Sequence, residues 1–199
     1  PHNWVKFRAC DYGYGSKSAV VWFAVNPNEQ LIIYRDLYVS KVLATDLADM
    51  VMEAEAEDGT IRYGVLDSSL WHKRGDTGPS LAEQMIKRGC RWRPSDRTPR
   101  SRINGKLEIH KRFKFTDAKE KEPGLRFFST CRNLIRTLPI LPLDDNNIED
   151  INTHTEDHAY DALRYGCTSR PMHTSYANKL YNNNNRTNNF IPSDKIFGY

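Results

Sequence analysis

Apolar residues in the first forty positions come in short runs that are separated by turn-forming residues. The runs at 5–10, 18–25 and 31–39 are rich in Val, Ile, Phe and Tyr, whereas Gly, Ser, Asn and Pro occupy 12–16 and 26–29. Runs of this length between such residues are typical of β-strands. The pattern predicts three strands joined by short turns, which form an antiparallel meander.

The spacing of apolar positions becomes helical after residue 41. Small and apolar residues recur three or four positions apart from Ala44 to Ala54, and Asp58-Gly59 ends the pattern. The predicted elements here are a helix over 42–57, a strand over 61–66, a helix over 80–88 and a strand over 90–93. Strands that alternate with helices usually pair in parallel, so we expect parallel pairing in this half.

The remaining third predicts shorter elements and then a polar end. We expect a helix over 99–113, a strand over 124–129, a helix over 130–138 with Leu134, Ile135 and Leu138 inward, a loop or short strand over 139–152, and a last helix over 155–168 capped by Thr153 or Thr155. The predicted division is one domain at 1–170 and a flexible Asn-rich tail at 171–199, too polar for a core. The whole is an α/β chain with a mixed central sheet flanked by helices, the outline of an RNase H-like fold.

Composition excludes several classes of protein. The four cysteines include no C-x-x-C pair, which argues against a zinc ribbon or a thioredoxin-like site and favours reduced thiols. No apolar run is long enough to span a membrane, and the first residues do not resemble a secretion signal. Because the chain begins with Pro1 and lacks an initiator Met, we expect it to be a piece of a longer protein.

Basic residues are concentrated in one part of the chain. The segment from Lys87 to Lys114 holds eleven Lys or Arg and only two acids, which gives it a net charge of +9. Because the whole chain totals +4, the remainder carries −5. A basic segment beside an acidic remainder indicates a polyanion bound near carboxylates, although a solvated basic helix and loop would give the same pattern.

Two aspartates follow directly after predicted strands. Asp11 comes after the first strand and precedes Gly13, and Asp67 comes after the strand at 61–66. Either residue alone could be a turn or cap residue. If the two strands are neighbours, however, the carboxylates lie side by side and repel each other unless a cation lies between them. Oxygen ligands of this kind suit Mg²⁺.

A third acidic group opens the last predicted helix. Asp157, His158 and Asp161 fall on one side of it near its amino-terminal end. Like charges at this spacing need a metal, the helix dipole or an arginine nearby, although a charged, capped helix start is a plainer interpretation. A second face holds small or apolar residues suited to close packing on the sheet: Ala159, Ala162, Leu163 and Gly166.

Together these motifs resemble the nuclease domain of the large terminase subunit of tailed bacteriophages, an RNase H-like and RuvC-like nuclease family. The matching motifs are Asp11-Tyr12-Gly13, Tyr63-Gly64-Val65-Leu66-Asp67 and Asp157-His158-Ala159-Tyr160-Asp161-Ala162-Leu163-Arg164-Tyr165. The resemblance covers roughly residues 4 to 170. No Gly-x-x-x-x-Gly-Lys-Ser/Thr motif occurs, so the ATPase motor domain of that family is expected to be absent from this chain.

The resemblance implies a metal-dependent endonuclease that hydrolyses phosphodiester bonds with two Mg²⁺ or Mn²⁺ ions. Asp11 is expected to bridge the ions, and Asp67 and Asp161 to complete the two metal sites. His158 is expected to take part in catalysis. Asp157 is expected to support these ligands or to cap the helix.

The resemblance also implies that the substrate is double-stranded DNA, cut from viral concatemers during genome packaging with little sequence preference. The residues expected to contact DNA are Arg91, Arg93, Arg97, Arg100, Arg102 and Lys106. The implied partners are an ATPase domain, a portal and a small terminase subunit. The implied location is the cytoplasm of the host cell, with no membrane partner and no secretion.

Three other interpretations stay open. A RuvC-like resolvase or an integrase would share the acidic triad but prefer branched DNA. The segment Asp11-Tyr12-Gly13-Tyr14-Gly15-Ser16-Lys17 also resembles the first phosphate loop of actin-like ATPases, which would bind ATP and cut no DNA. A non-catalytic DNA-binding module is the third, against which the three acids argue, because carboxylates without metal weaken DNA binding.

Overall fold

A computed structural model describes residues 1, 3–73, 78–114, 123–145, 147–153 and 155–171. The strands in these ranges are β1 (Val5–Asp11), β2 (Lys17–Val25), β3 (Leu31–Ser40), β4 (Ile61–Leu66), β5 (Arg93–Pro94) and β6 (Leu125–Phe127). The helices are α1 (Ala44–Ala54), α2 (Leu81–Lys87), α3 (Ser101–Phe113), α4 (Arg132–Thr137) and α5 (His158–Ser169), with short 3₁₀ helices η1 (Ser68–Trp71) and η2 (Leu138–Ile140).

The six strands form one mixed sheet in the order β5-β4-β1-β2-β3-β6. The meander β1-β2-β3 is antiparallel, while β4 pairs with β1, β5 with β4, and β6 with β3 in parallel. Both predicted kinds of pairing are therefore confirmed. The consequence for function is that the carboxyl ends of β1 and β4 lie next to each other.

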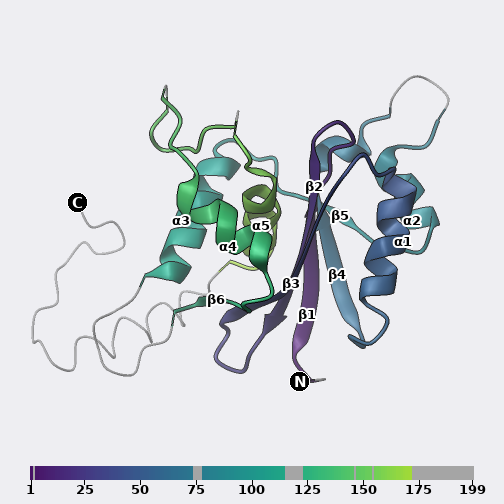
Figure 1. Ribbon diagram of the computed structural model, residues 1–199, viewed down its shortest axis with the longest axis horizontal. Coiled ribbons are helices and arrows are strands. Elements are labelled where there is room, and N and C mark those ends of the chain that lie inside the picture. Colours follow the sequence, from purple (N-terminus) through teal and green to yellow (C-terminus); the bar gives the residue numbers. More distant parts are fainter. Residues whose placement is uncertain (2, 74–77, 115–122, 146, 154, 172–199) are drawn as a thin grey trace, which may run out of the picture.

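Helices cover both faces of the sheet (Figure 1). α1 and α2 lie on one face, and α3, α4 and α5 lie on the other. Side chains of a strand alternate between faces, and β2 serves both cores: Val21 and Phe23 pack toward α5, whereas Val20 and Trp22 pack toward α1 and α2. No described helix is long and apolar enough to cross a membrane.

The helix α5 packs closely against the sheet through the predicted small-residue face. Ala159, Ala162 and Leu163 are buried in the core that this face shares with β1 and β2. A Cβ atom added to Gly166 would come within 2.0 Å of the ring of Phe23, so no larger residue fits there without rearrangement. This close approach carries the amino-terminal end of α5, with its acids, to the carboxyl end of β1.

Several predicted boundaries are wrong. The strand predicted at 90–93 is only Arg93–Pro94, and the last helix begins at His158 rather than at 155. Asp157 takes the N-cap position without a side-chain cap hydrogen bond, while the hydroxyl of Thr155 donates to the carbonyl of Asn152. These corrections follow from tertiary contacts that local propensity does not encode.

Two further expectations concern single segments. Ile135, expected to face inward, is 47% exposed, whereas Leu134 on the same helix is fully buried. The four cysteines are buried and free, in agreement with reduced thiols. The predicted tail at 171–199 lies, apart from its first residue, outside the described residues.

Candidate active site

Asp11 and Asp67 lie at the same edge of the sheet on adjacent parallel strands. Cys10 of β1 is in register with Leu66 of β4, and the backbone N–H of Asp67 donates to the carbonyl of Cys10 at 3.2 Å. The two aspartates therefore follow paired residues at the carboxyl ends of their strands. This is the edge at which open α/β sheets commonly bind ligands.

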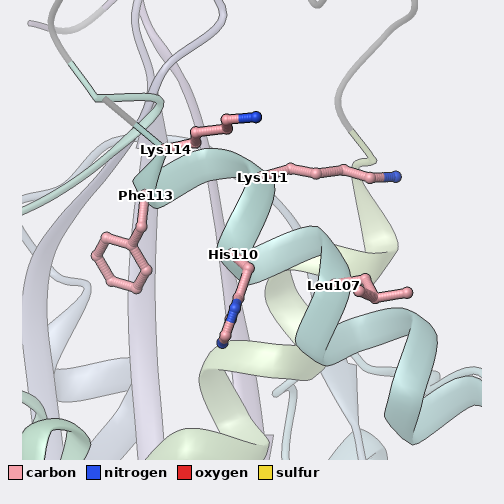
Figure 2. A pocket seen from close by; sticks show the side chains of 5 residues that line it. All are labelled: Leu107, His110, Lys111, Phe113 and Lys114. Atoms are coloured by element: carbon pink, nitrogen blue, oxygen red, sulfur yellow. The ribbon is translucent and has the colours of Figure 1, made fainter. Parts of the chain in front are cut away.

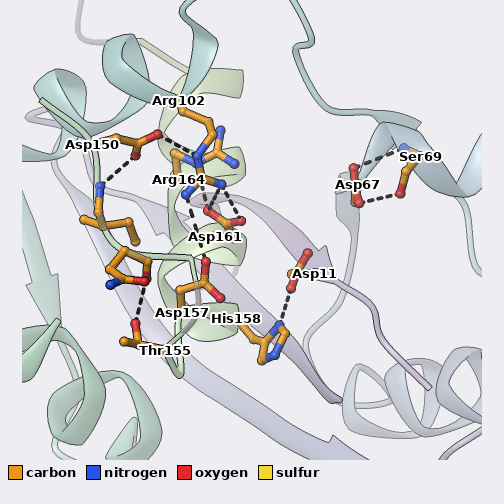
Figure 3. Close-up of polar contacts among 12 residues, drawn as sticks. Asp11, Asp67, Ser69, Arg102, Asp150, Thr155, Asp157, His158, Asp161 and Arg164 are labelled. Atoms are coloured by element: carbon orange, nitrogen blue, oxygen red, sulfur yellow. Dashed lines mark hydrogen bonds and ion pairs between the residues drawn. The ribbon is translucent and has the colours of Figure 1, made fainter. Parts of the chain in front are cut away.

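Asp11 is held by a histidine from α5. The Nδ1 atom of His158 lies 2.9 Å from Oδ2 of Asp11, as Figure 3 shows. Burial raises the pKa of Asp11, the carboxylates of Asp161 and Asp67 raise it further, and His158 opposes the rise. The hydrogen bond to Asp11 in turn raises the pKa of His158. Asp11 thus interacts electrostatically with both other acids of the predicted triad.

Asp161 is buried and accepts hydrogen bonds from two arginines. The Nε of Arg164, one helical turn further along α5, donates to Oδ1 at 3.0 Å. The Nη1 of Arg102, from the first turn of α3, donates to Oδ2 at 3.1 Å (Figure 3). The acid predicted as a metal ligand is therefore neutralised by guanidinium groups in this structure.

Arg102 also reaches two further acids. Its Nε donates to Asp150 at 2.9 Å, and its Nη2 lies 4.0 Å from the carboxylate of Asp157. Burial and the neighbouring Asp161 raise the pKa of Asp157 to about 6. Asp150, which the sequence did not single out, thus belongs to the same cluster as Asp157 and Asp161.

Asp67 is turned toward its own chain. Its side chain accepts from the backbone N–H of Ser69 at 3.1 Å and from the Ser69 hydroxyl at 2.5 Å, which caps η1. The next residue, Ser68, is also fixed, because its buried backbone N–H donates to the hydroxyl of Ser95. In Figure 3 the Asp67 carboxylate faces Ser69 and lies on the far side of Asp11 from Asp161.

The chemistry of these side chains fits a divalent cation, but their present orientations do not form a closed ligand set. Among the described residues, no three His, Cys, Asp or Glu side chains are gathered closely enough to hold a metal ion. The donors are nonetheless carboxylate oxygens, the ligands of Mg²⁺ and Mn²⁺. Burial raises the pKa of Asp11, and the carboxylates of Asp161 and Asp67 raise it further, so a cation beside Asp11 would stabilise its ionised form. The residues therefore fit the ion after rotation of side chains.

The residues predicted to contact DNA divide into two groups. Those after β4 are exposed: Nη1 of Arg97 lies 2.9 Å from Nε2 of His72, and the guanidinium of Arg93 lies over the ring of Tyr63. Arg91 is also exposed and has no side-chain ion pair within the described ranges. Arg93 lines a hollow between β5 and α5 together with Ser95, Thr168 and Ser169.

The second group consists of Arg100, Arg102 and Lys106, which contact the segment before α5. Arg100 lies 3.5 Å from Glu149, and Nζ of Lys106 donates to the carbonyl of Ile148 at 3.2 Å. Arg102 belongs to the carboxylate cluster. A second hollow, shown in Figure 2, lies on the carboxyl-terminal half of α3. Its lining residues are Leu107, His110, Lys111, Phe113 and Lys114.

Three residues that shape the site were not predicted from the sequence. Asp150 ends an acidic run that begins at Asp144, and this run was the available signal. Arg164 stood inside the quoted motif, three residues after Asp161, where a helix places it on the same side. Ser95 follows β5 and gave no sequence signal, because its role depends on the packing of β5 beside β4.

Comparison with known proteins places the fold. No protein family and no curated protein sequence matches the chain, whereas several solved structures do. The chain superposes on the large terminase of a thermophilic bacteriophage with a TM-score of 0.66, 12% identity, and coverage of 85% of this chain and 40% of that one. For the P22 large terminase nuclease domain the values are 0.61, 18%, 85% and 83%.

A third similar structure is the large terminase nuclease of the thermophilic phage G20c with bound zinc, at a TM-score of 0.56, 13% identity, and coverage of 86% of this chain and 84% of that one. The chain thus spans less than half of the first terminase but most of the two nuclease domains. The RNase H-like architecture is confirmed, and the chain has the fold of the nuclease domain of phage large terminases.

Proposed function

We propose that the protein is a metal-dependent endonuclease that cleaves double-stranded DNA. The observation that carries the proposal is the arrival of Asp11, Asp67 and Asp161 at one edge of the sheet from three separate elements. The similar fold of terminase nucleases supports it, as do the zinc and cobalt bound to the G20c protein. Catalytic carboxylates grouped in this way serve metal-assisted phosphodiester hydrolysis.

Asp11 lies between the other two acids, and Asp11, Asp67 and Asp161 would together hold the ions. Asp67 would first turn away from Ser69. When bound, two Mg²⁺ or Mn²⁺ ions lower the pKa of an attacking water and stabilise the leaving 3′ oxygen. Asp157 and Asp150 would keep Arg102 close to Asp161.

His158 has a role of its own in the proposal. Its hydrogen bond to Asp11 fixes the orientation of the ring, and its raised pKa favours the protonated form. A protonated imidazole at this position stabilises negative charge on a phosphate beside Asp11 and can donate a proton. We therefore assign it to the catalytic group.

The exposed arginines after β4 would hold the DNA backbone. Arg91, Arg93 and Arg97 are exposed, and the hollow beside Arg93 is lined by hydroxyl groups, by Asp96 and by apolar residues. Contacts of this kind bind phosphates without reading bases. Such binding weakens steeply as salt rises. Arg100, Arg102 and Lys106 would add to it after partial release from the segment at 148–150.

The wider role follows from the same likeness. We propose that the chain is the nuclease part of a genome-packaging protein, which cuts concatemeric DNA in the cytoplasm of the host cell. An ATPase domain, a portal and a small terminase subunit would be its partners. The support is that a phage large terminase contains a region of this fold over 40% of its length.

The test is cleavage of plasmid DNA in Mn²⁺ or Mg²⁺ by the parent chain and by Asp11→Asn and Asp161→Asn. Each variant should cut at least about 100-fold more slowly, because it loses a charge that the ions need. Asp49→Asn is the matched control, since Asp49 pairs with Arg88 on the opposite face of the sheet. Cleavage by either site variant at the parent rate contradicts the proposal.

The same assay separates related activities. Linear duplex should be cut at least as well as a four-way junction, whereas preferential junction cleavage would indicate a resolvase. A chelator should abolish cutting of both.

A further inference from the structure

Arg102 stands out among the basic residues because it contacts acids that arrive from different segments. It lies in the first turn of α3 and reaches Asp150 before α5 and Asp161 within α5. The next acid, Asp157, lies 4.0 Å away. Arg102 is therefore the guanidinium that links Asp161 to the acids of the segment before it.

The two arginines on Asp161 differ in how firmly they are held. The side chain of Arg164 is 4% exposed, and its stem packs so closely on Gly105 that an added Cβ would lie 2.4 Å from its Cγ. The side chain of Arg102 is 31% exposed. Arg164 is thus fixed by packing, whereas Arg102 has a route to solvent.

The hydrogen bonding of Arg102 is also incomplete. Its Nη2 atom is buried and has no hydrogen-bond partner in the described part of the chain, so part of the donor capacity of the guanidinium is unused. The charges of the acids are balanced only in part, because Arg102 and Arg164 together face three carboxylates. Such an arrangement favours exchange of the guanidinium for a cation of higher charge.

We propose that Arg102 is an internal counter-ion that occupies the Asp161 side of the site and competes with divalent cations for it. The inference rests on the proposed function and adds a regulator to the same site. Arg164 holds Oδ1 of Asp161, whereas Arg102 donates to Oδ2 at 3.1 Å. A divalent ion at Oδ2 would be repelled by the Arg102 guanidinium, so the ion binds there only when Arg102 leaves. Asp150, which holds the Nε atom, keeps the released side chain close by.

The test is the affinity for Mn²⁺, measured by calorimetry without DNA, for the parent chain and for Arg102→Gln. The variant should bind Mn²⁺ about tenfold more tightly, since the competing charge is gone. Arg100→Gln is the matched control: it removes the same charge two residues away, where Arg100 pairs with exposed Glu149. Its affinity should change less than about twofold. Arg102→Lys, which keeps the charge, should stay near the parent.

A purely structural role of Arg102 predicts no gain in Mn²⁺ affinity. If Arg102 only positions Asp161, Arg102→Gln binds Mn²⁺ equally or more weakly, and the inference is wrong. Equal binding by parent and variant, with cleavage still dependent on Asp11, overturns the counter-ion role alone. Absence of Mn²⁺ binding from both chains overturns the proposed function as well.

Loss of folding in Arg102→Gln is also informative. The unpaired acids would then need another cation, so Mn²⁺ should restore the folded circular dichroism spectrum. A variant that stays unfolded in saturating Mn²⁺ contradicts the inference.

Discussion

The two sides of the candidate site hold their carboxylates by different means. On the β4 side, Asp67 accepts hydrogen bonds from the backbone N–H and the hydroxyl of Ser69. The turn after Asp67 is fixed by the hydrogen bond from Ser68 to the Ser95 hydroxyl. On the α5 side, Asp161 is buried and bound by Arg102 and Arg164. One side therefore uses hydrogen bonds from neutral donors, and the other uses full positive charges.

The cause of the difference is burial. Asp67 keeps contact with solvent, so water and two neutral donors stabilise its charge. Asp157 and Asp161 are buried within one helical turn of each other, where an ionised pair is costly unless cations lie beside it. The comparison teaches that the α5 side is tied to the stability of the fold, whereas the β4 side is free to rearrange around a ligand.

The sharpest way to break this comparison is Arg164→Met. The variant removes one partner of a buried ion pair, so the free energy of unfolding should fall by about 3–4 kcal/mol. Urea denaturation in a chelator measures it. Arg136→Met is the control, because Arg136 pairs with Glu156 on the surface and such pairs contribute about 0–1 kcal/mol. Equal losses in both variants would show that the α5 side does not depend on its buried arginine.

A smaller effect is expected on the β4 side from Ser95→Ala. The buried N–H of Ser68 loses its acceptor, which should lower the free energy of unfolding by about 1–2 kcal/mol. Ser69→Ala is the matched control, since Ser69 is exposed and water can replace its hydroxyl. The same denaturation measurement applies. If Ser69→Ala destabilises the protein more than Ser95→Ala does, the turn after Asp67 depends on the hydrogen bonds between Ser69 and Asp67 more than on the contact with Ser95.

The positions of the three predicted acids followed from local pattern. The run before Asp67 is bounded by turn residues and gives β4 the predicted limits of 61–66. Gly166 and the small residues beside it predicted the close packing of α5, because only such a face approaches a sheet closely. In each case the decisive information lay within one element.

The partners of those acids depended on packing between elements. A run of basic residues does not show which arginine turns inward. Arg102 does so because α3 starts after Arg100, whose φ of 66° is left-handed, and then packs beside α5. Asp150 lies in a loop whose backbone course cannot be predicted from the spacing of apolar residues. The side-chain direction of Asp67 was likewise unpredicted, although aspartates often bond to the backbone two residues on.

The smallest effect tests the charge on the α5 side through pH. Asp157 has a pKa of about 6 in the folded protein, raised by burial and by Asp161 from an ordinary 3.8. The folded state therefore binds the proton more tightly than the unfolded state. This contribution to stability is full below pH 4 and is lost as pH rises through 6.

Asp157→Asn, which stays neutral, should remove this loss. In a chelator the variant should match the parent at pH 4 and exceed it by at least about 1 kcal/mol at pH 7, since a shift of one pKa unit corresponds to about 1.4 kcal/mol. Glu156→Gln next to it is the control with the opposite sign. Arg136 lowers the pKa of Glu156 to about 2, so that its stabilisation is present at pH 7 and lost in acid. If Asp157→Asn were less stable than the parent at pH 7, Arg102 would compensate the buried charge fully, and the α5 side would carry no surplus of negative charge for a cation to relieve.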